Sequence, residues 1–315
     1  MSQFVFILWI PISIALFVKF RPAKAVTLAY LCGWLLLPAT EIKMQGFWDI
    51  DKTLVIAAGV VAGVLLCCRN PLAGLQPCWS DVLLIAFAFA AGTSSLTNGL
   101  GTYDGASTFV NKLIYYGVAF VCGRLFLRER RDLYEAVQSV CCAAALYAIL
   151  CLWEWRMSPQ IHQALYGEFQ HRFQQHKRWS FFRPVVCFPH ALSLGVFMAG
   201  ASLMSVWLYM NRTLRSFGPL SPGVIVTLCL VGLLTSMSVG PWGLFAAGLL
   251  LLWVWKQTRL RAMALVPLLF VVGWIGMRYS GASDGEWLVS IAKEASAERA
   301  DSLQYRIDAE TILLD

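Results

Sequence analysis

Ten apolar stretches, separated mostly by short polar loops, run through almost the whole of this 315-residue chain. They lie at 3–18, 25–40, 53–68, 82–97, 110–127, 133–153, 186–210, 221–237, 240–256 and 262–278. A hydrocarbon core takes about 20 apolar residues as helix, with about 17 as the lower limit. Backbone groups in lipid are satisfied only in helices or closed barrels, and these stretches are too long for barrel strands. Each stretch is therefore predicted to be a helix.

The composition agrees with a membrane protein, because 58% of the residues are hydrophobic and only 14% are charged. A soluble domain carries about 25% charged residues. The net charge of +7 would suggest nucleic acid as a partner of a soluble protein. Here the basic residues lie in loops between apolar stretches, so membrane lipids with anionic head groups are the expected partners and nucleic acid is not.

Lysine and arginine are divided unequally between alternate loops. One set of loops holds thirteen: Lys19, Arg21, Lys24, Arg69, Arg124, Arg128, Arg130, Arg131, Arg212, Arg215, Lys256, Arg259 and Arg261. The short loops of the opposite set hold only Lys43, Lys52 and Lys112. Cytoplasmic loops carry the excess of basic residues, so the first set is predicted to be cytoplasmic and the N-terminus to face outward.

Two outer segments carry basic residues against this rule, namely the loop 154–185 and the region after the last apolar stretch. Their basic residues are Arg156, Arg172, Lys177, Arg178, Arg183, Arg278, Lys293, Arg299 and Arg306. One explanation is an anionic ligand at the outer face. The other is that long loops cross the membrane regardless of their charge.

The outer loop begins with Ser158-Pro159, a pair typical of a helix start. After it, every fourth residue is apolar, at Ile161, Leu165, Phe169 and Phe173. This spacing predicts an amphipathic helix lying on the outer membrane surface. Such a helix would either form the floor of a ligand cavity or only cover the surface of the helical bundle.

Arg183 and His190 follow, with Arg183 expected at the entrance to the seventh span and His190 one to two turns inside it. A guanidinium presents a fixed fork of donors that suits phosphate oxygens. An ionisable side chain within a span usually faces the bundle interior. Both residues are candidates for substrate binding. The alternative is that Arg183 extends toward lipid head groups and His190 is a neutral packing group.

In the tail, Asp301 and Gln304 have the spacing of a capping box, which predicts a helix of about 14 residues from there. This helix would hold Arg306 against the outer bundle face or present a solvated charged face. The sequence ends in Ile312-Leu313-Leu314-Asp315 without a helix stop signal. We therefore expect a chain truncated at its C-terminus.

Three segments resemble the family of O-antigen ligases and polymerases. Arg183-Pro184 through His190 resembles the R-P-x-x-x-x-x-H element, and Thr235 through Trp242 resembles the T-x-S-x-G turn between two spans. Residues 299–306 resemble the R-x-x-S-L-x-x-R element of the family's large outer loop. The similarity extends over roughly 25–315.

The resemblance implies a multi-span glycosyltransferase of lipopolysaccharide or polysaccharide biosynthesis, in the bacterial inner (cytoplasmic) membrane. Such an enzyme takes a glycan from undecaprenyl diphosphate at the outer face and passes it to lipid A-core or to another glycan. It uses no nucleotide sugar, no cofactor and no essential metal. The implied substrate-binding residues are Arg183, Arg299, Arg306 and His190, with the arginines either contacting the diphosphate or supporting the outer loop. Ligases and polymerases share these residues, so the acceptor and the glycan stay open.

One departure matters for catalysis. The family's catalytic His follows the R-x-x-S-L-x-x-R element, whereas this chain has no His after His190. The expected catalytic His therefore lies beyond Asp315, and we expect the 315-residue chain to be inactive by itself. The alternative function is a non-enzymatic transporter or flippase of lipid-linked saccharides.

The sequence thus predicts an all-α fold, a polytopic transmembrane bundle of about ten spans with an outer-face amphipathic helix and an outer helical tail. The bundle covers 1–278 and includes the outer loop 154–185, and 279–315 begins an incomplete periplasmic loop. The four histidines lack the spacing of metal ligands, so no metal site is expected. The ten cysteines lie mostly in apolar stretches and are predicted to pack as small hydrophobic residues.

Overall fold

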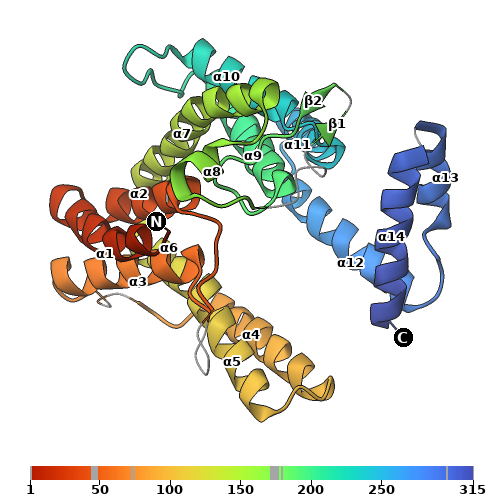
Figure 1. The fold of residues 1–315 in the computed structure, drawn as a ribbon, viewed down its shortest axis with the longest axis horizontal. Helices are drawn as coiled ribbons and strands as arrows, with labels where there is room; N and C mark the ends of the chain where they lie inside the picture. The colour runs from red at the N-terminus through yellow and green to blue at the C-terminus, as the bar shows by residue number, and fades with distance from the viewer. Residues whose placement is uncertain are drawn as a thin grey trace. The chain divides into compact units, whose positions relative to one another are not determined.

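The computed structural model describes residues 2–43, 49–71, 73, 75–170, 177–178, 180–295 and 297–314. Helices form nearly all of its regular structure (Figure 1). The first are α1 (Ser2–Lys19), α2 (Pro22–Leu36), α3 (Lys52–Cys67), α4 (Trp79–Thr97), α5 (Thr102–Lys112), a π-helical turn (Leu113–Gly117) and α6 (Val118–Phe126). They are followed by α7 (Arg130–Met157), α8 (Ile161–Tyr166), β1 (Lys177–Arg178), β2 (Phe181–Phe182), α9 (Ala191–Met210) and α10 (Pro222–Thr235). The last are α11 (Val239–Thr258), a 3₁₀ turn (Arg261–Leu265), α12 (Val266–Tyr279), α13 (Glu286–Ala295) and α14 (Ala297–Leu314).

Each of the ten apolar stretches contains a helix, which confirms the all-α prediction. Within the described residues, seven helical segments are long and apolar enough to cross a membrane. They are Ser2–Lys19, Trp79–Thr97, Thr102–Phe126, Arg130–Met157, Ala191–Met210, Val239–Thr258 and Ala262–Tyr279. The helices α2, α3 and α10 are apolar but shorter. The protein is therefore a membrane-embedded helical protein, and the number of ten spans stays a prediction.

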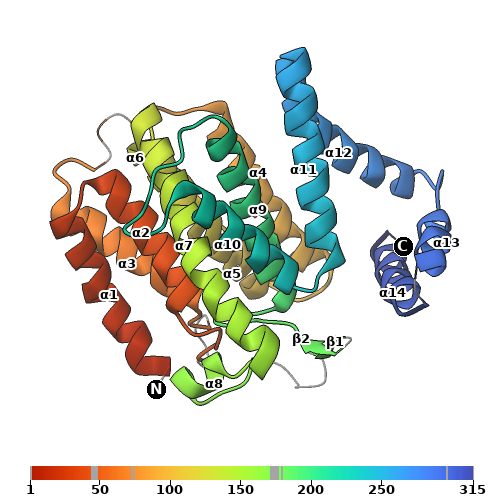
Figure 2. The ribbon, with the colours of Figure 1, turned by 90° about the horizontal axis from the view of Figure 1, so that it is seen from above.

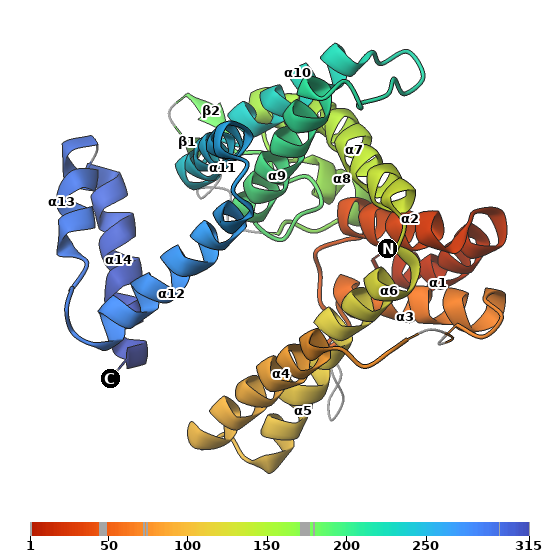
Figure 3. The same ribbon diagram turned by 180° about the vertical axis from the view of Figure 1, so that it is seen from behind.

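The chain divides into two compact units, Met1–Gly248 and Leu249–Asp315. Helix α11 passes from the first unit into the second. In the first unit α1 packs along α3, with α2 against both (Figure 2). The helix α4 packs on α5, which continues through the π-helical turn into α6 (Figure 3). Whether 279–315 begins a periplasmic loop stays a prediction.

Glycine allows α1 and α3 to approach closely. Gly59 and Gly63 lie four residues apart on α3, and a Cβ atom at Gly59 would stand 2.6 Å from the Ser13 hydroxyl oxygen. A Cβ atom at Gly63 would collide with the ring of Phe17. Small residues at this spacing are a common basis of helix packing in membranes, where apolar burial alone does not drive helices together.

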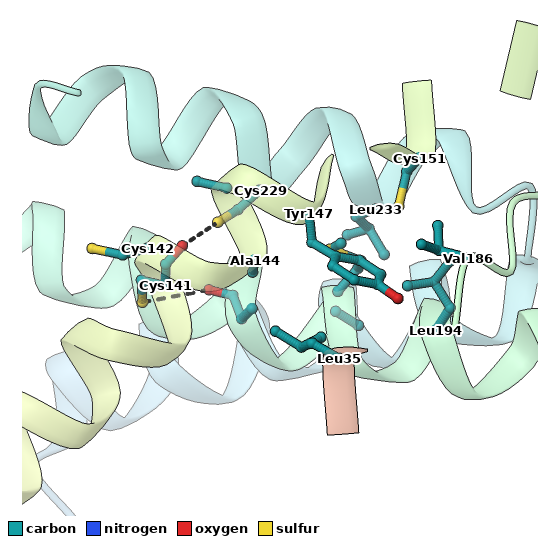
Figure 4. Packing of buried hydrophobic residues seen from close by; sticks show 14 of the residues in the cluster. Leu35, Cys141, Cys142, Ala144, Tyr147, Cys151, Val186, Leu194, Cys229 and Leu233 are labelled. Atoms are coloured by element: carbon teal, nitrogen blue, oxygen red, sulfur yellow. Dashed lines mark hydrogen bonds between the residues drawn. The ribbon is translucent and has the colours of Figure 1, made fainter. Parts of the chain in front are cut away.

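A hydrophobic core of the first unit lies between α7, α9 and α10 (Figure 4). The ring of Tyr147 is enclosed there among Leu35, Val186 and Leu194. The Cys229 thiol donates a hydrogen bond to the carbonyl oxygen of Cys141 at 3.5 Å. All ten cysteines are free, and six of them are buried. Burial in helix contacts agrees with their predicted role as small packing residues.

The prediction for the outer loop is wrong beyond one short helix. Helix α8 covers only Ile161–Tyr166, its N-cap is Gln160, and Gly167 ends it with φ at 84°. Glycine adopts this left-handed conformation without steric cost and is a common helix stop. Ser158, expected as the N-cap, instead ends α7 with φ at 87°. Phe169 lies outside the helix, and Phe173 lies outside the described residues.

The tail is helical as predicted, but the helix begins earlier. Helix α14 has 18 residues and begins at Ala297, so Asp301 lies within it and the predicted capping box is wrong. Helix α14 packs on α13, the helix that precedes it in the second unit. The start of this helix therefore does not depend on a capping box at Asp301.

Candidate functional site at the 185–188 turn

The structure joins two of the three segments that carry the family resemblance. Arg183 follows β2, and one terminal nitrogen of its guanidinium donates to the Ser238 hydroxyl oxygen at 2.6 Å. Ser238 is buried in the turn between α10 and α11, where Met237 has φ at 50°. This turn lies between two helices, as the resemblance implied. The contact links residues 55 positions apart and leaves Arg183 partly exposed.

His190 is not inside the seventh helix, which corrects the sequence prediction. It is the exposed N-cap residue of α9, with φ −142° and ψ 146°. Two prolines explain part of the late helix start, because the residue before a proline avoids the helical conformation. Pro189 restricts Phe188 in this way, and Pro184 restricts Arg183. The residues between them form a compact turn, which we call the 185–188 turn.

Arg299 and Arg306 belong to the second unit. Arg306 is exposed on α14, whereas the side chain of Arg299 lies outside what the structure describes. Arg278, another basic residue of the predicted outer segment, forms its hydrogen bonds and ion pair within this unit. Its guanidinium donates to the carbonyl oxygens of Ser283 and Ile307 at 3.3 and 3.2 Å and lies 3.4 Å from the Glu310 carboxylate. Arg278 thus stabilises the fold of the tail.

The 185–188 turn is held from α7 by Glu154, whose side chain is buried. One carboxylate oxygen accepts from the backbone N–H groups of Val185 and Val186, both at 2.8 Å. The other accepts from the N–H of Ile161 at 3.1 Å, at the start of α8. A single carboxylate therefore fixes both ends of the outer loop to the last turn of α7.

Lys52 holds the same turn from the first residue of α3. Its ammonium group donates to the carbonyl oxygens of Cys187 at 3.1 Å and Trp34 at 3.3 Å. It lies 4.4 Å from the ring centroid of Trp34 and 5.4 Å from that of Phe188. Lys52 is only 4% exposed, and no carboxylate of the described residues forms an ion pair with it. Carbonyl dipoles and aromatic faces thus take the place of a counter-charge.

Tyr147 and Gln170 complete the set. The Tyr147 hydroxyl accepts from the N–H of Cys187 at 2.9 Å. The Gln170 amide donates to the carbonyl oxygens of Val186 at 2.7 Å and Phe188 at 2.8 Å. We call Lys52, Tyr147, Glu154 and Gln170 the polar clamp.

The clamp and one hydrogen bond within the turn together satisfy the backbone of the turn completely. The N–H of Phe188 donates to the carbonyl oxygen of Val185 at 2.9 Å, so every backbone N–H and C=O of residues 185–188 has a partner. Val186 has φ at 52°, a left-handed conformation that is a clear outlier for a β-branched residue. Such backbone strain persists only where the surroundings dictate it, and it is concentrated at functional sites.

A second contact anchors α8 to the segment after α2. The N–H of Ala39 donates to Nε2 of His162 at 3.1 Å, and Nδ1 of His162 lies 2.7 Å from the carbonyl oxygen of Glu168. These partners define a neutral ring with its proton on Nδ1. Burial lowers the pKa of His162, which agrees with the neutral form. The Tyr166 hydroxyl also donates to the carbonyl oxygen of Leu36.

An apolar groove of about 760 Å³ begins beside the turn. It lies between α2, α6, α7 and α9, and its lining includes Val26, Leu31, Val140, Val196 and Phe197. Trp34 and Phe188, the two rings beside Lys52, also line it. The groove is thus contiguous with the 185–188 turn and suits a hydrocarbon chain.

Sequence reasoning missed the clamp, although a weak signal was present. Glu154 and Lys52 directly adjoin the apolar stretches 133–153 and 53–68. Charged residues in membrane helices are costly and usually mark a site or a polar contact. Gln170 and Tyr147 carried no such signal, because their partners are backbone atoms far away in the sequence.

The described residues contain no group of three or more His, Cys, Asp or Glu placed to hold a metal ion. What the site can do chemically rests on Arg183, whose guanidinium stands at Ser238 beside the fully hydrogen-bonded 185–188 turn. No protein-family model matches the chain, and comparisons with curated proteins and with solved structures gave no significant match.

Proposed function

We propose that this protein is a membrane glycosyltransferase that binds a glycan linked to a polyprenyl diphosphate. Arg183 would hold the diphosphate, and the groove beside Phe188 would receive the hydrocarbon of the carrier. The acceptor would be another glycan or lipid A-core at the outer face of the bacterial inner membrane. Arg299, Arg306 and His190 are further candidates for contacts with the substrate.

The observation that carries the proposal is the contact between Arg183 and Ser238. It joins the R-P-x-x-x-x-x-H segment to the T-x-S-x-G turn, two segments that were singled out separately in the sequence. A guanidinium in a fixed position suits phosphate recognition, since its planar fork of donors matches the phosphate oxygens. The adjoining apolar groove supports a lipid as the rest of the ligand.

The reaction would consist of attack by an acceptor hydroxyl on the anomeric carbon of the glycan. The bond from that carbon to the diphosphate oxygen breaks, and the bonding electrons leave with the lipid diphosphate. The proton of the acceptor hydroxyl passes to the released diphosphate or to water. Negative charge grows on the leaving group, and a guanidinium already in place stabilises it without reorganisation. We assign no catalytic base, so the decisive measurement is binding of the donor.

The test measures the dissociation constant of the full chain in detergent for farnesyl diphosphate, with farnesol as the uncharged comparison. Arg183→Ala should weaken binding of the diphosphate by about tenfold or more, since a hydrogen bond to a charged group contributes about 1.5–3 kcal/mol. Arg183→Lys should restore part of it, and Arg21→Ala, at the other end of the helices, serves as the matched control. Unchanged affinity in Arg183→Ala would refute the diphosphate site.

A further inference from the structure

The polar clamp raises the question of why a turn in a membrane protein is held by a buried lysine and a buried glutamate. Glu154 is 1% exposed and Lys52 is 4% exposed. Burying an ion costs several kcal/mol even after the protein relaxes, and apolar residues of similar size often give equal or greater stability. Stability alone is therefore a poor explanation for these two side chains.

The clamp does specify one backbone conformation. Its members come from α3, α7 and the residue Gln170 after α8, and together they contact the N–H or C=O groups of the turn from several directions. Val186 is held at φ 52°, a conformation that the isolated segment would rarely adopt. A satisfied network of buried polar groups is a means of enforcing a single arrangement.

The turn lies between the two site candidates of the first unit. Arg183 precedes it by two residues and His190 follows it by two. Pro184 and Pro189 restrict the backbone on both sides, and Pro184 is itself fully buried. Whatever holds residues 185–188 therefore also decides where the backbones of Arg183 and His190 stand.

We propose that Lys52 and Glu154 are positioning residues that preform the anion site, with Tyr147 and Gln170 supporting them. They hold the 185–188 turn so that the Arg183 guanidinium stands beside Ser238 before the diphosphate of a lipid arrives. Preorganisation improves affinity because the loop need not be ordered during binding. This inference rests on the proposed function, since it assumes that Arg183 contacts the diphosphate.

The experiment compares binding with local protection in the full chain in detergent. The probe is farnesyl diphosphate, and the variants are Lys52→Met, Glu154→Gln and Gln170→Ala. Met keeps most of the length of the Lys52 side chain without its donors. Gln replaces one acceptor oxygen of Glu154 by an NH₂ group, so it cannot accept all three N–H groups. Gln170→Ala is the milder variant, because Gln170 is partly exposed and lies outside the long helices.

Two controls separate positioning from general damage. Asp132→Asn removes a buried carboxylate charge at the opposite end of α7, where Asp132 pairs with Arg21. Lys52→Arg retains a cation with donors that can also lie on the two rings. Hydrogen exchange of the amides of Val185, Val186 and Cys187 reports on the turn, and thermal unfolding reports on the whole molecule.

We expect the dissociation constant to rise about tenfold in Lys52→Met and Glu154→Gln and about threefold in Gln170→Ala. Exchange of the three amides should accelerate in each of them, while α9 and α10 keep their protection. Lys52→Arg should recover most of the affinity, and Asp132→Asn should bind like the wild type.

The outcomes tell the two proposals apart. If Arg183→Ala weakens binding but none of the clamp variants does, the positioning role is refuted and the diphosphate site stands. If all variants, Asp132→Asn included, lose affinity in proportion to their loss of thermal stability, the clamp is merely structural. If Arg183→Ala binds normally, the proposed function itself is wrong.

Discussion

The two ends of the helices in the first unit use charged residues in opposite ways. At the end where α7 begins, which is predicted to be cytoplasmic, arginines pair directly with carboxylates. Arg21 lies 3.4 Å from Asp132, Arg131 lies 2.9 Å from Glu135, and Arg124 pairs with Asp81. Most of these side chains are partly or largely exposed. We call this end the inner end.

At the end where α7 finishes, predicted to face outward, Glu154 and Lys52 are buried, and neither pairs with an opposite charge among the described residues. Both bind backbone groups of the 185–188 turn instead. Exposed pairs contribute little to stability, whereas buried charges are costly unless every hydrogen bond is made. The outer end thus carries the buried polar groups that depend on complete hydrogen bonding, whereas the inner end carries more numerous charges that are mostly exposed and paired with one another.

The largest expected difference between the ends is in accessibility. Ser180 and Ser216 are exposed serines at the outer and inner ends, so each is replaced by cysteine in a chain whose exposed Cys67 and Cys78 are serine. A maleimide that does not cross membranes should label Ser180→Cys in intact spheroplasts and Ser216→Cys only after permeabilisation. Labelling with the reverse pattern would invert the predicted orientation and remove the outer site.

The next largest effect is on stability. Glu154→Ala leaves three backbone N–H groups without their acceptor and should lower the free energy of unfolding by about 3–5 kcal/mol. Asp132→Ala, at the inner end of the same helix, should cost about 1 kcal/mol. Thermal unfolding in detergent measures both, and equal losses would show that the two ends do not differ.

A smaller effect is expected from one hydroxyl. Tyr147→Phe keeps the buried ring but leaves the N–H of Cys187 unpaired, which should cost about 1–2 kcal/mol. Tyr134→Phe on the same helix is the control, because Tyr134 is exposed, and should stay within about 0.5 kcal/mol of the wild type. A loss in both variants would point to general sensitivity of α7.

The thermal stability of the protein should also depend on pH through His162 at the outer end. Burial lowers the pKa of His162 in the folded state, so the fold favours the neutral ring. The contribution of neutral His162 to stability is complete above the pKa of an unfolded histidine, about 6.5. This contribution is lost as the pH falls below that value. We expect the melting temperature to drop between pH 7.5 and 5.5, and the drop to be smaller in His162→Gln. The same drop in the variant would assign it to other groups.

The smallest effect is expected from an exposed pair at the inner end. Arg131→Ala removes the pair with Glu135 one helical turn away, and both side chains are substantially exposed. Solvent and salt screen such pairs, so the melting temperature should not shift measurably. A clear loss of stability that persists at high salt would contradict this view of the inner end.

Much of the fold was predictable because it depends on local pattern. The apolar stretches predicted where the helices lie, and the short break between the stretches 221–237 and 240–256 predicted a turn, which the structure has between α10 and α11. The length of α8 could also have been read from Gly167, a helix stop signal that the apolar spacing obscured. These features follow from neighbouring residues along one segment.

The candidate site was predictable only in part. Arg183 was singled out by its residue type and place, but its partner Ser238 emerged from a contact between distant segments. The exposed position of His190 at the start of α9 follows in part from Pro189, a local signal that the apolar stretch 186–210 obscured. The clamp depends on contacts that α3, α7 and Gln170 make with one turn. Arg278, predicted with the outer basic residues, instead stabilises the fold of the tail. Helix periodicity is a property of a single segment, so the sequence by itself determined a helical membrane protein. Every residue type offers the same backbone N–H and C=O groups, so the sequence does not show which backbone groups a polar side chain will bind. Only the tertiary structure therefore decided which charged and polar residues hold the site.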